Sequence, residues 1–181
     1  MDKILVLHGV NLNMLGKRNP EHYGLFTFEE LIEQIEQFGS SYNLMIDSFQ
    51  TNYEGEMVER IHQAVGENYK GIIINAGAWT HYSYAIRDAL ELLQAPIIEV
   101  HLSNIQNREE FRKISVFESL VRKKYFGEGM ESYFQAIKEL VREICPRDNR
   151  ILLLQERESV LRLPPQLFGW CHKPFGLFPL H

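Results

Sequence analysis

The chain has 181 residues, 45% of them hydrophobic, and a formal net charge of −5. This length suits one domain with a buried core, and the acidic balance argues against a nucleic-acid partner. No apolar stretch approaches the ~20 residues of a membrane span. The first residues resemble a strand more than a signal peptide, so we expect a cytoplasmic protein with no membrane partner. Two lone cysteines, Cys145 and Cys171, make neither a disulfide framework nor a zinc site.

Short apolar runs alternate with amphipathic segments through most of the chain. The long loop at 9–26 is of a kind that often serves as a functional lid. Thr27 and Glu30 form a capping box that opens a helix with apolar residues at helical spacing. In chain order, the predicted elements are a strand at 4–7, a helix opening at 27, a strand at 44–49, a helix at 54–68, a strand at 70–75, a helix at 80–93, a strand at 96–100, a polar fifth strand at 120–126 and a helix at 129–144.

This alternation implies a parallel sheet with right-handed crossovers, and therefore an α/β fold. Pro146 stops the last helix. Residues 147–181 hold four prolines and several aromatic residues without sustained periodicity. We expect them to form a C-terminal extension outside the sheet domain of residues 1–146.

Polar side chains occur where three of the predicted strands end. They are Asn11 after the first strand, Asn75 and His81 at and after the third, and Glu99 and His101 at the fourth. In open parallel sheets the carboxyl ends of the strands line the ligand crevice. The sequence therefore predicts a site with titratable groups and amide donors on rigid elements. Because the chain is acidic, an anionic substrate needs local cations, and Arg18, Arg108 and Arg112 are candidates.

Four blocks of the sequence resemble the type II 3-dehydroquinate dehydratases, in the same order and with the same spacing. They are NLNMLGKRNPEHYG (11–24), QTNYEGE (50–56), INAGAWTHYSYAIRDAL (74–90) and IEVHLSNIQNREEFR (98–112). The resemblance covers about residues 3–140. It implies a flavodoxin-like three-layer sandwich with strand order 2-1-3-4-5, with residues 1–146 as the dehydroquinase domain.

The resemblance also implies an activity. It is the dehydration of 3-dehydroquinate to 3-dehydroshikimate by anti elimination through an enolate, in the shikimate pathway or in quinate catabolism. It implies no cofactor, no metal and no Schiff base. The expected partners are the small-molecule substrate and further copies of the chain, in a dodecamer built from trimers.

Five positions match catalytic residues of the family. Tyr23 matches the base; a phenol with the ordinary pKa of ~10 needs a nearby cation for this role, and Arg18 matches the essential arginine. His101 matches the general acid, a task that suits histidine near neutral pH. Glu99 lies on the same face of the strand because side chains alternate, and can orient that imidazole. Asn11 matches the residue that holds a water against the enolate oxygen.

Other positions match residues that bind the substrate. They are Asn75, His81 and Arg112 for hydroxyl groups, the backbone amides of Leu102 and Ser103 for the carboxylate, and Asp88 for the site of a neighbouring subunit.

The chain departs from the family pattern in several places, among them Asn19, where the family usually has Glu, and the tail after about residue 146, which exceeds the usual family length. His8 stands where the family usually has Asn, and Val10 where it has Pro, which predicts a looser loop around Asn11. Residues 116–134 replace small and apolar residues with polar ones, and Ser132 stands where a glycine is usual. Since that segment supplies a strand and subunit contacts, these changes bear on assembly.

Two other interpretations are open from the sequence. A catalytically impaired flavodoxin-like protein could bind a small molecule without turning it over; retention of the matched residues favours the enzyme. A flavin or nucleotide binder has the same fold, but the sequence contains neither GxGxxG nor GxxxxGK[ST].

Overall fold

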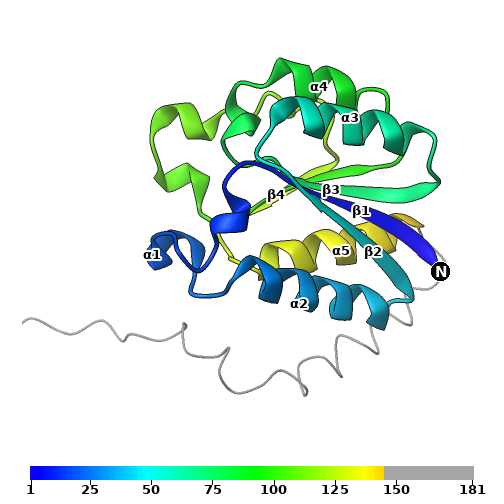
Figure 1. Ribbon diagram of the computed structural model, residues 1–181, viewed down its shortest axis with the longest axis horizontal. Helices are drawn as coiled ribbons and strands as arrows, with labels where there is room; N and C mark the ends of the chain where they lie inside the picture. Colours follow the sequence, from blue (N-terminus) through cyan, green and yellow to red (C-terminus); the bar gives the residue numbers. More distant parts are fainter. Residues whose placement is uncertain (145–181) are drawn as a thin grey trace, which may run out of the picture. The chain divides into compact units, whose positions relative to one another are not determined.

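The computed structural model describes residues 1–144, which form a five-stranded parallel sheet covered by helices (Figure 1). The strand order is β2-β1-β3-β4-β5, which confirms the predicted flavodoxin-like α/β fold with order 2-1-3-4-5. The strands are β1 (Asp2–His8), β2 (Leu44–Gln50), β3 (Tyr69–Asn75), β4 (Ile97–His101) and β5 (Lys123–Phe126).

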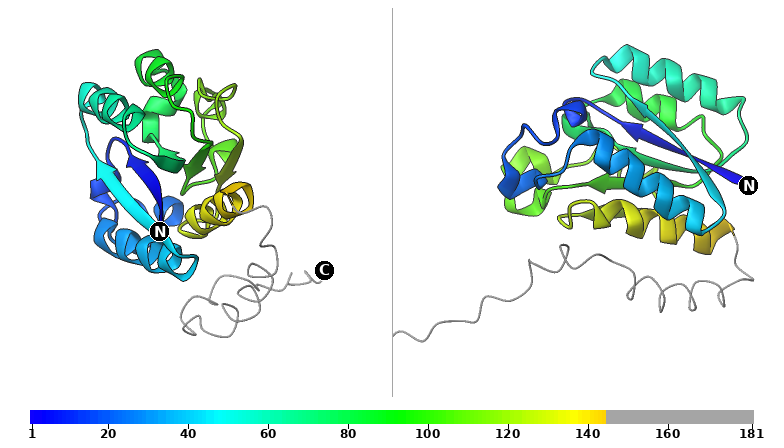
Figure 2. Two further views of the ribbon diagram at one scale, coloured as in Figure 1. Left: turned by 90° about the vertical axis from the view of Figure 1, so that its right-hand side faces the viewer. Right: turned by 60° about the horizontal axis from the view of Figure 1, so that its bottom comes forward.

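Helices on the two faces of the sheet make the outer layers of the sandwich. α3 and α4 cover one face, and α2 and α5 lie side by side on the other (Figures 1 and 2). The α-helices are α1 (Pro20–Tyr23), α2 (Phe28–Ser41), α3 (Glu54–Val65), α4 (Tyr84–Leu90) and α5 (Glu131–Ile144); the 3₁₀ helices are η1 (Leu12–Met14), η2 (Gly77–His81), η3 (Ile105–Asn107) and η4 (Glu110–Lys113).

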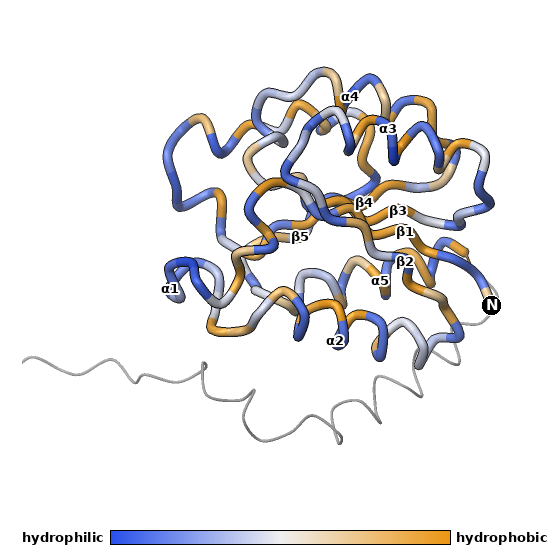
Figure 3. Tube along the Cα trace, viewed as in Figure 1, coloured by the Kyte–Doolittle hydropathy of each residue, from blue (hydrophilic) through white to orange (hydrophobic). Residues whose placement is uncertain are grey.

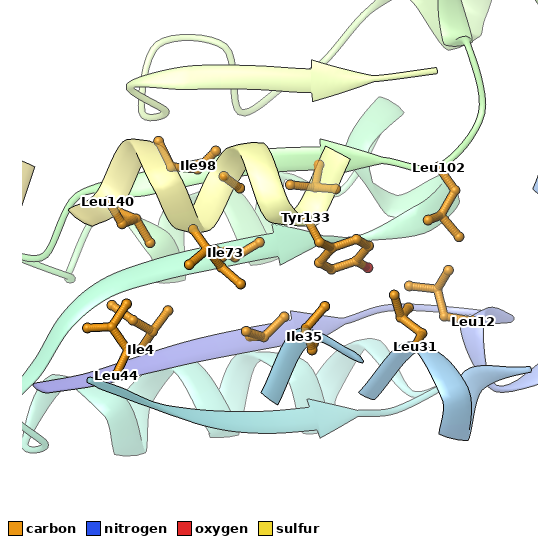
Figure 4. Packing of buried hydrophobic residues seen from close by; sticks show 14 of the residues in the cluster. Ile4, Leu12, Leu31, Ile35, Leu44, Ile73, Ile98, Leu102, Tyr133 and Leu140 are labelled. Atoms are coloured by element: carbon orange, nitrogen blue, oxygen red, sulfur yellow. The ribbon is translucent and has the colours of Figure 1, made fainter. Parts of the chain in front are cut away.

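The hydrophobic core is divided in two by the sheet. Successive side chains of a strand point to opposite faces, so Ile4 and Val6 belong to the core under α2 and α5, whereas Leu5 and Leu7 belong to the core under α3 and α4. Burial of each such side chain stabilises the fold by about 1.5–3 kcal/mol. The central strands stand out as the hydrophobic middle layer in Figure 3, and Figure 4 shows aliphatic side chains packed around Tyr133.

The capping box predicted at the start of α2 is present. The Thr27 amide donates to the Glu30 carboxylate at 2.8 Å, and the Glu30 amide donates to Thr27 Oγ1 at 3.2 Å. Two backbone amides that the helix leaves without partners are thereby satisfied.

The helix predicted at 80–93 is wrong in its extent. The structure instead has η2 followed by the short α4, because Ser83 interrupts the chain with an extended backbone and caps α4 through its Oγ, which accepts from the Ile86 amide at 3.1 Å. The helix predicted at 54–68 ends at Val65, and the loop predicted at 9–26 contains η1 and α1.

The polar fifth strand is present but shorter than the predicted 120–126. The chain forms a turn first, in which the carbonyl oxygen of Phe117 accepts hydrogen bonds from the amides of Leu120 and Val121. β5 is an edge strand, where charged residues discourage pairing with other chains. Lys123 pairs with Glu139 of α5 at 3.2 Å, and Lys124 pairs with Glu118.

Cys145, Cys171 and the extension predicted at 147–181 lie outside the described residues. Within residues 1–144, no helix is both long enough and apolar enough to cross a membrane.

Candidate active site

The strand register brings the carboxyl ends of four strands to one edge of the sheet. His8 lies opposite both Gln50 of β2 and Asn75 of β3, and Glu99 of β4 lies opposite Ile74. A cavity of about 120 Å³ opens at this edge, smaller than the roughly 300–1,000 Å³ of sites for drug-sized ligands. The predicted site residues that line it are Asn11, Arg18, Tyr23, Asn75, His81, His101, Leu102, Ser103 and Arg112.

His101 and Glu99 form a buried pair at the end of β4. The imidazole Nε2 of His101 donates to Glu99 Oε1 at 2.8 Å, and Ser115 Oγ donates to the other carboxylate oxygen at 2.8 Å. The side chain of Glu99 is fully buried and that of His101 is 6% exposed. Because Nε2 is held by the carboxylate, Nδ1 is the ring nitrogen that remains to exchange a proton with a ligand.

The environment of Glu99 favours its charged form. Burial acts to raise the pKa of this carboxyl, but the hydrogen bonds from His101 and Ser115 outweigh burial and leave the pKa below its ordinary value. An ionised Glu99 stabilises a positive charge on the adjacent imidazole. The pair is therefore equipped to carry a proton and to deliver it.

His81 is a neutral neighbour of this pair. Its Nδ1 donates to the Ile114 carbonyl oxygen at 2.7 Å, and its ring stacks on that of His101 with centroids 6.4 Å apart. Burial lowers the pKa of His81, and the positive charges of His101 and Arg112 act in the same direction. With the proton on Nδ1, Nε2 is left as a hydrogen-bond acceptor suited to a ligand hydroxyl.

Two arginines meet at the phenol of Tyr23. Arg18 Nη2 lies 2.7 Å from Tyr23 Oη, and the Arg18 guanidinium also stacks over the ring at 3.7 Å from its centroid. Arg108 Nη1 donates to the same oxygen at 3.5 Å. Donors from two cations stabilise negative charge on the phenol oxygen. Burial, Arg108 and Arg112 lower the pKa of Arg18, yet a guanidinium stays charged in proteins.

Arg112 lies on η4 and also lines the cavity. Glu109 bridges it to Arg108: the carboxylate is 2.9 Å from Arg112 Nε and 3.4 Å from Arg108 Nε. The Arg112 guanidinium also lies 4.8 Å from the centre of the Phe111 ring. Two arginines, Arg18 and Arg112, thus line the cavity, and Arg108 lies beside them in a chain of net negative charge. This concentration of positive charge favours an anionic ligand.

The loop that carries Asn11 is fixed from β2. Asn11 adopts a left-handed backbone (φ 65°), which asparagine tolerates better than most residues. Its amide donates to Asn52 Oδ1 at 2.8 Å, and Gln50 Nε2 donates to the Gly9 carbonyl at 3.3 Å. A Cβ at Gly9 would approach the Ala76 carbonyl oxygen to 2.3 Å, so only glycine fits there. These contacts hold the loop although position 10 is Val rather than Pro.

The turn after β4 completes the cavity. The carbonyls of His101 and Leu102 accept from the amides of Gly127 and Gly129 at 3.3 and 3.0 Å. The turn is therefore tied to the segment that follows β5, and Leu102 and Ser103 line the cavity.

Comparisons with known proteins agree with this geometry. A family model described as "Dehydroquinase class II" matches residues 2–141. The chain belongs to the class II dehydroquinase family. This confirms the resemblance drawn from the four sequence blocks.

Relatives of this chain match it over nearly their whole length. The 3-dehydroquinate dehydratase of Pelobacter propionicus is 58% identical over 137 residues, which are 76% of this chain and 92% of that protein. That of Leptothrix cholodnii is 51% identical over 138 residues, 76% of this chain and 93% of that protein. The crystal structure of the type II dehydroquinase from Butyrivibrio crossotus superposes with a TM-score of 0.75 at 44% identity, covering 77% of this chain and 97% of that one.

Two of the predicted site residues, Glu99 and Asp88, do not line the cavity. Glu99 lies behind His101 and acts on it from there. Asp88 is on α4 with its side chain 72% exposed, paired with Arg87 at 3.2 Å. Within the chain it does not line the cavity.

Several residues that support the site were missed by sequence reasoning. Asn52 and Gln50 stand in the QTNYEGE block, which carried the family resemblance but suggested no role. Arg108 was named only as a candidate cation. Ser115 lies where the hydrophobic pattern is weak, and no signal in the sequence pointed to it. In the described part of this dehydroquinase, no group of three or more His, Cys, Asp and Glu side chains is placed to hold a metal ion.

Proposed function

We propose that this dehydroquinase dehydrates 3-dehydroquinate to 3-dehydroshikimate, as the names of its relatives say of those proteins. The observation that carries the proposal is that one small cavity holds both a phenol under two guanidinium groups and an imidazole backed by a buried carboxylate. A base and an acid fixed on different elements are what the loss of water beside a ketone requires. This arrangement favours the enzyme over a protein that only binds.

The reaction would begin at Tyr23. As phenolate, stabilised by Arg18 and Arg108, it removes the proton on the carbon next to the ketone, and the C–H electrons become those of the enolate. Asn11, just after the carboxyl end of β1, holds a water against the enolate oxygen as negative charge develops there. Tyr23 leaves this step as a neutral phenol.

His101 would complete the elimination. The enolate re-forms the ketone and expels the hydroxyl from the next carbon as a conjugated double bond forms. The His101 imidazolium protonates that hydroxyl as it departs, so water leaves, and Glu99 stabilises the imidazolium beforehand. Proton transfer from Tyr23 back to His101 through water restores the enzyme.

The remaining residues would bind the substrate. Asn75, His81 and Arg112 face the cavity and suit hydroxyl groups, and the amides of Leu102 and Ser103 suit the carboxylate. In this proposal, protein side chains, backbone amides and water carry out each step. A place in the shikimate pathway or in quinate catabolism follows from the substrate, and a cytoplasmic location remains a prediction.

The activity is tested by mixing the purified chain with 3-dehydroquinate and following the ultraviolet absorbance of the conjugated enone. We expect turnover that persists in a strong chelator and after borohydride treatment in the presence of substrate. Binding of substrate with no absorbance change would favour the impaired binding protein. Inactivation by borohydride would indicate an imine and contradict the enolate route.

We further propose that the chain assembles into trimers within a dodecamer. Support comes from a patch around α4 and η4 in which Tyr82, Tyr84, Phe111 and Ile114 are each more than half exposed, since large exposed apolar patches mark interaction sites. Asp88 lies on the same helix as Tyr84, and its side chain is 72% exposed, so it would be accessible to a second subunit. Light scattering measures the assembly, and a fully active monomer would contradict a shared site.

A further inference from the structure

A chain of three buried polar side chains runs beneath the cavity. Asn75 at the end of β3 donates through Nδ2 to Tyr133 Oη at 3.0 Å, and Tyr133 Oη lies 3.1 Å from Nδ1 of His8 at the end of β1. Tyr133 and His8 are fully buried, and Asn75 is 3% exposed. Figure 4 shows the Tyr133 ring projecting from α5 into the core, with its oxygen toward the carboxyl ends of the strands.

The chemistry of the three groups fixes the direction of these bonds. The Nδ2 of an asparagine can only donate, so Tyr133 Oη accepts from Asn75. A phenol has one proton, and Nδ1 of His8 is its remaining partner, so Tyr133 donates to His8. The imidazole proton of His8 therefore lies on Nε2, which has no hydrogen-bond partner among the described residues. Burial lowers the pKa of His8 to about 3, so Nδ1 stays an acceptor at working pH.

The direction of these hydrogen bonds determines which way the oxygen and the NH₂ group of the Asn75 carboxamide point. Its Oδ1 accepts from the Gly77 amide at 3.3 Å while its Nδ2 is held by Tyr133. If the carboxamide were flipped, its NH₂ would face the Gly77 N–H and its oxygen would draw the Tyr133 proton. His8 Nδ1 would then lose its donor. Leaving a buried polar atom without a partner costs ~1–3 kcal/mol, so the flipped state is disfavoured at two places.

We propose that Tyr133 and His8 are positioning residues that hold the Asn75 carboxamide in one orientation. They thereby determine whether Asn75 acts as donor or acceptor toward a substrate hydroxyl. The proposal rests on the proposed function, in which Asn75 contacts the substrate. Neither residue lines the cavity, and they act only through Asn75.

A matched pair at position 8 tests the proposal. The side-chain oxygen of His8→Asn can take the place of Nδ1 as acceptor, whereas His8→Leu offers none, and both variants lose the ring contact with Phe28. We expect His8→Leu and Tyr133→Phe to raise KM for 3-dehydroquinate about tenfold, the effect of one misdirected hydrogen bond, with kcat within about threefold. His8→Asn should keep the wild-type KM. Equal increases in the two His8 variants would overturn the proposal.

Coupling to Asn75 separates positioning from a general loss of packing. In an Asn75→Ala background, Tyr133→Phe should change KM by less than about twofold, because the group it acts through is gone; a full tenfold effect there would overturn the proposal. A readout without turnover keeps the test independent of the proposed function. The Asn75 side-chain NH₂ signals, identified by their loss in Asn75→Ala, should exchange slowly with solvent in wild type and His8→Asn and faster in Tyr133→Phe and His8→Leu. Unchanged exchange in all variants would refute the positioning role even if 3-dehydroquinate were not the substrate.

Discussion

On the β4 side of the cavity, His101 and Glu99 are almost completely buried and joined by a 2.8 Å hydrogen bond, whereas on the other side Arg18 and Tyr23 lie on a loop with many exposed residues. The buried pair is preorganised by a strand and by Ser115 from a distant turn. The loop pair is held by an ion–aromatic contact and a phenol hydrogen bond, both made within six residues of chain.

The difference in burial between the two pairs has a physical reason. A buried carboxylate needs permanent partners, because removing one leaves an uncompensated charge. Arg18 and Tyr23 instead hold each other through local contacts, and Tyr23 packs against the edge of the core. The acid of the proposed reaction is thus fixed by a strand, and the base is placed by the loop.

Removing the reacting group on either side should have the largest effect. Tyr23→Phe and His101→Ala should each lower kcat by about 10²–10⁴-fold, the usual contribution of a general base or acid. Binding of 3-dehydroquinate, measured by calorimetry, should weaken far less. A near-normal rate in Tyr23→Phe would remove tyrosine from the base role. If His81→Ala were inactive and His101→Ala active, the roles assigned to the two histidines would have to be exchanged.

Removing the charge beside the phenol should have the next largest effect. Arg18→Ala should lower kcat by about 10²-fold, because the phenolate loses its closer cation. Arg108→Ala should cost less, since its donor lies 3.5 Å from the phenol oxygen. Lys17→Ala, which removes an adjacent charge of the same loop, is the matched control. A loss as large in Lys17→Ala would mean that the overall charge of the loop matters rather than its geometry.

Substitutions on the β4 side of the cavity should lower the free energy of unfolding more than substitutions on the loop side. Ser115→Ala removes a hydrogen bond to the buried Glu99 carboxylate and should lower the free energy of unfolding by about 1.5–3 kcal/mol. Arg18→Ala should lower it by less, about 0.5–1 kcal/mol, because its contacts with Tyr23 are only partly buried. Urea unfolding of the two variants gives both values. Equal destabilisation would show that the loop is as much a part of the folded core as β4.

A further effect is expected on the pH dependence of stability. The pKa of His8 is about 3 in the folded chain against 6.5 ordinarily, so between these pH values only the unfolded chain binds the proton. The free energy of unfolding therefore falls as the pH drops, by up to about 1.4 kcal/mol per pH unit from this residue. In His8→Asn the slope between pH 7 and 4.5 should be shallower. Parallel slopes would mean that His8 is not held neutral.

Much of the buried side of the site could be predicted from the sequence. The apolar runs gave the strands, the carboxyl-end rule placed Asn75 and His101 at one edge, and the two-residue period put Glu99 on the face of His101. The helix at 80–93 was wrong because helical spacing continues across Ser83, while its cap geometry depends on a backbone turn that spacing does not reveal. The pairing of Arg18 with Tyr23 followed from the resemblance, since five residues of loop carry no periodic signal.

By itself, then, the sequence determined the features that depend on local pattern: the order of strands and helices, the capping box of α2, and the family's blocks of catalytic residues. Only the tertiary structure decided the contacts between distant segments. Ser115 reaches Glu99 across 16 residues, Asn52 reaches Asn11 across 41, and His8 meets Tyr133 across 125. Such contacts arise where elements that are distant in the sequence pack together. Which group donates in each buried hydrogen bond depends on all the partners of the network, so no single stretch of sequence encodes it.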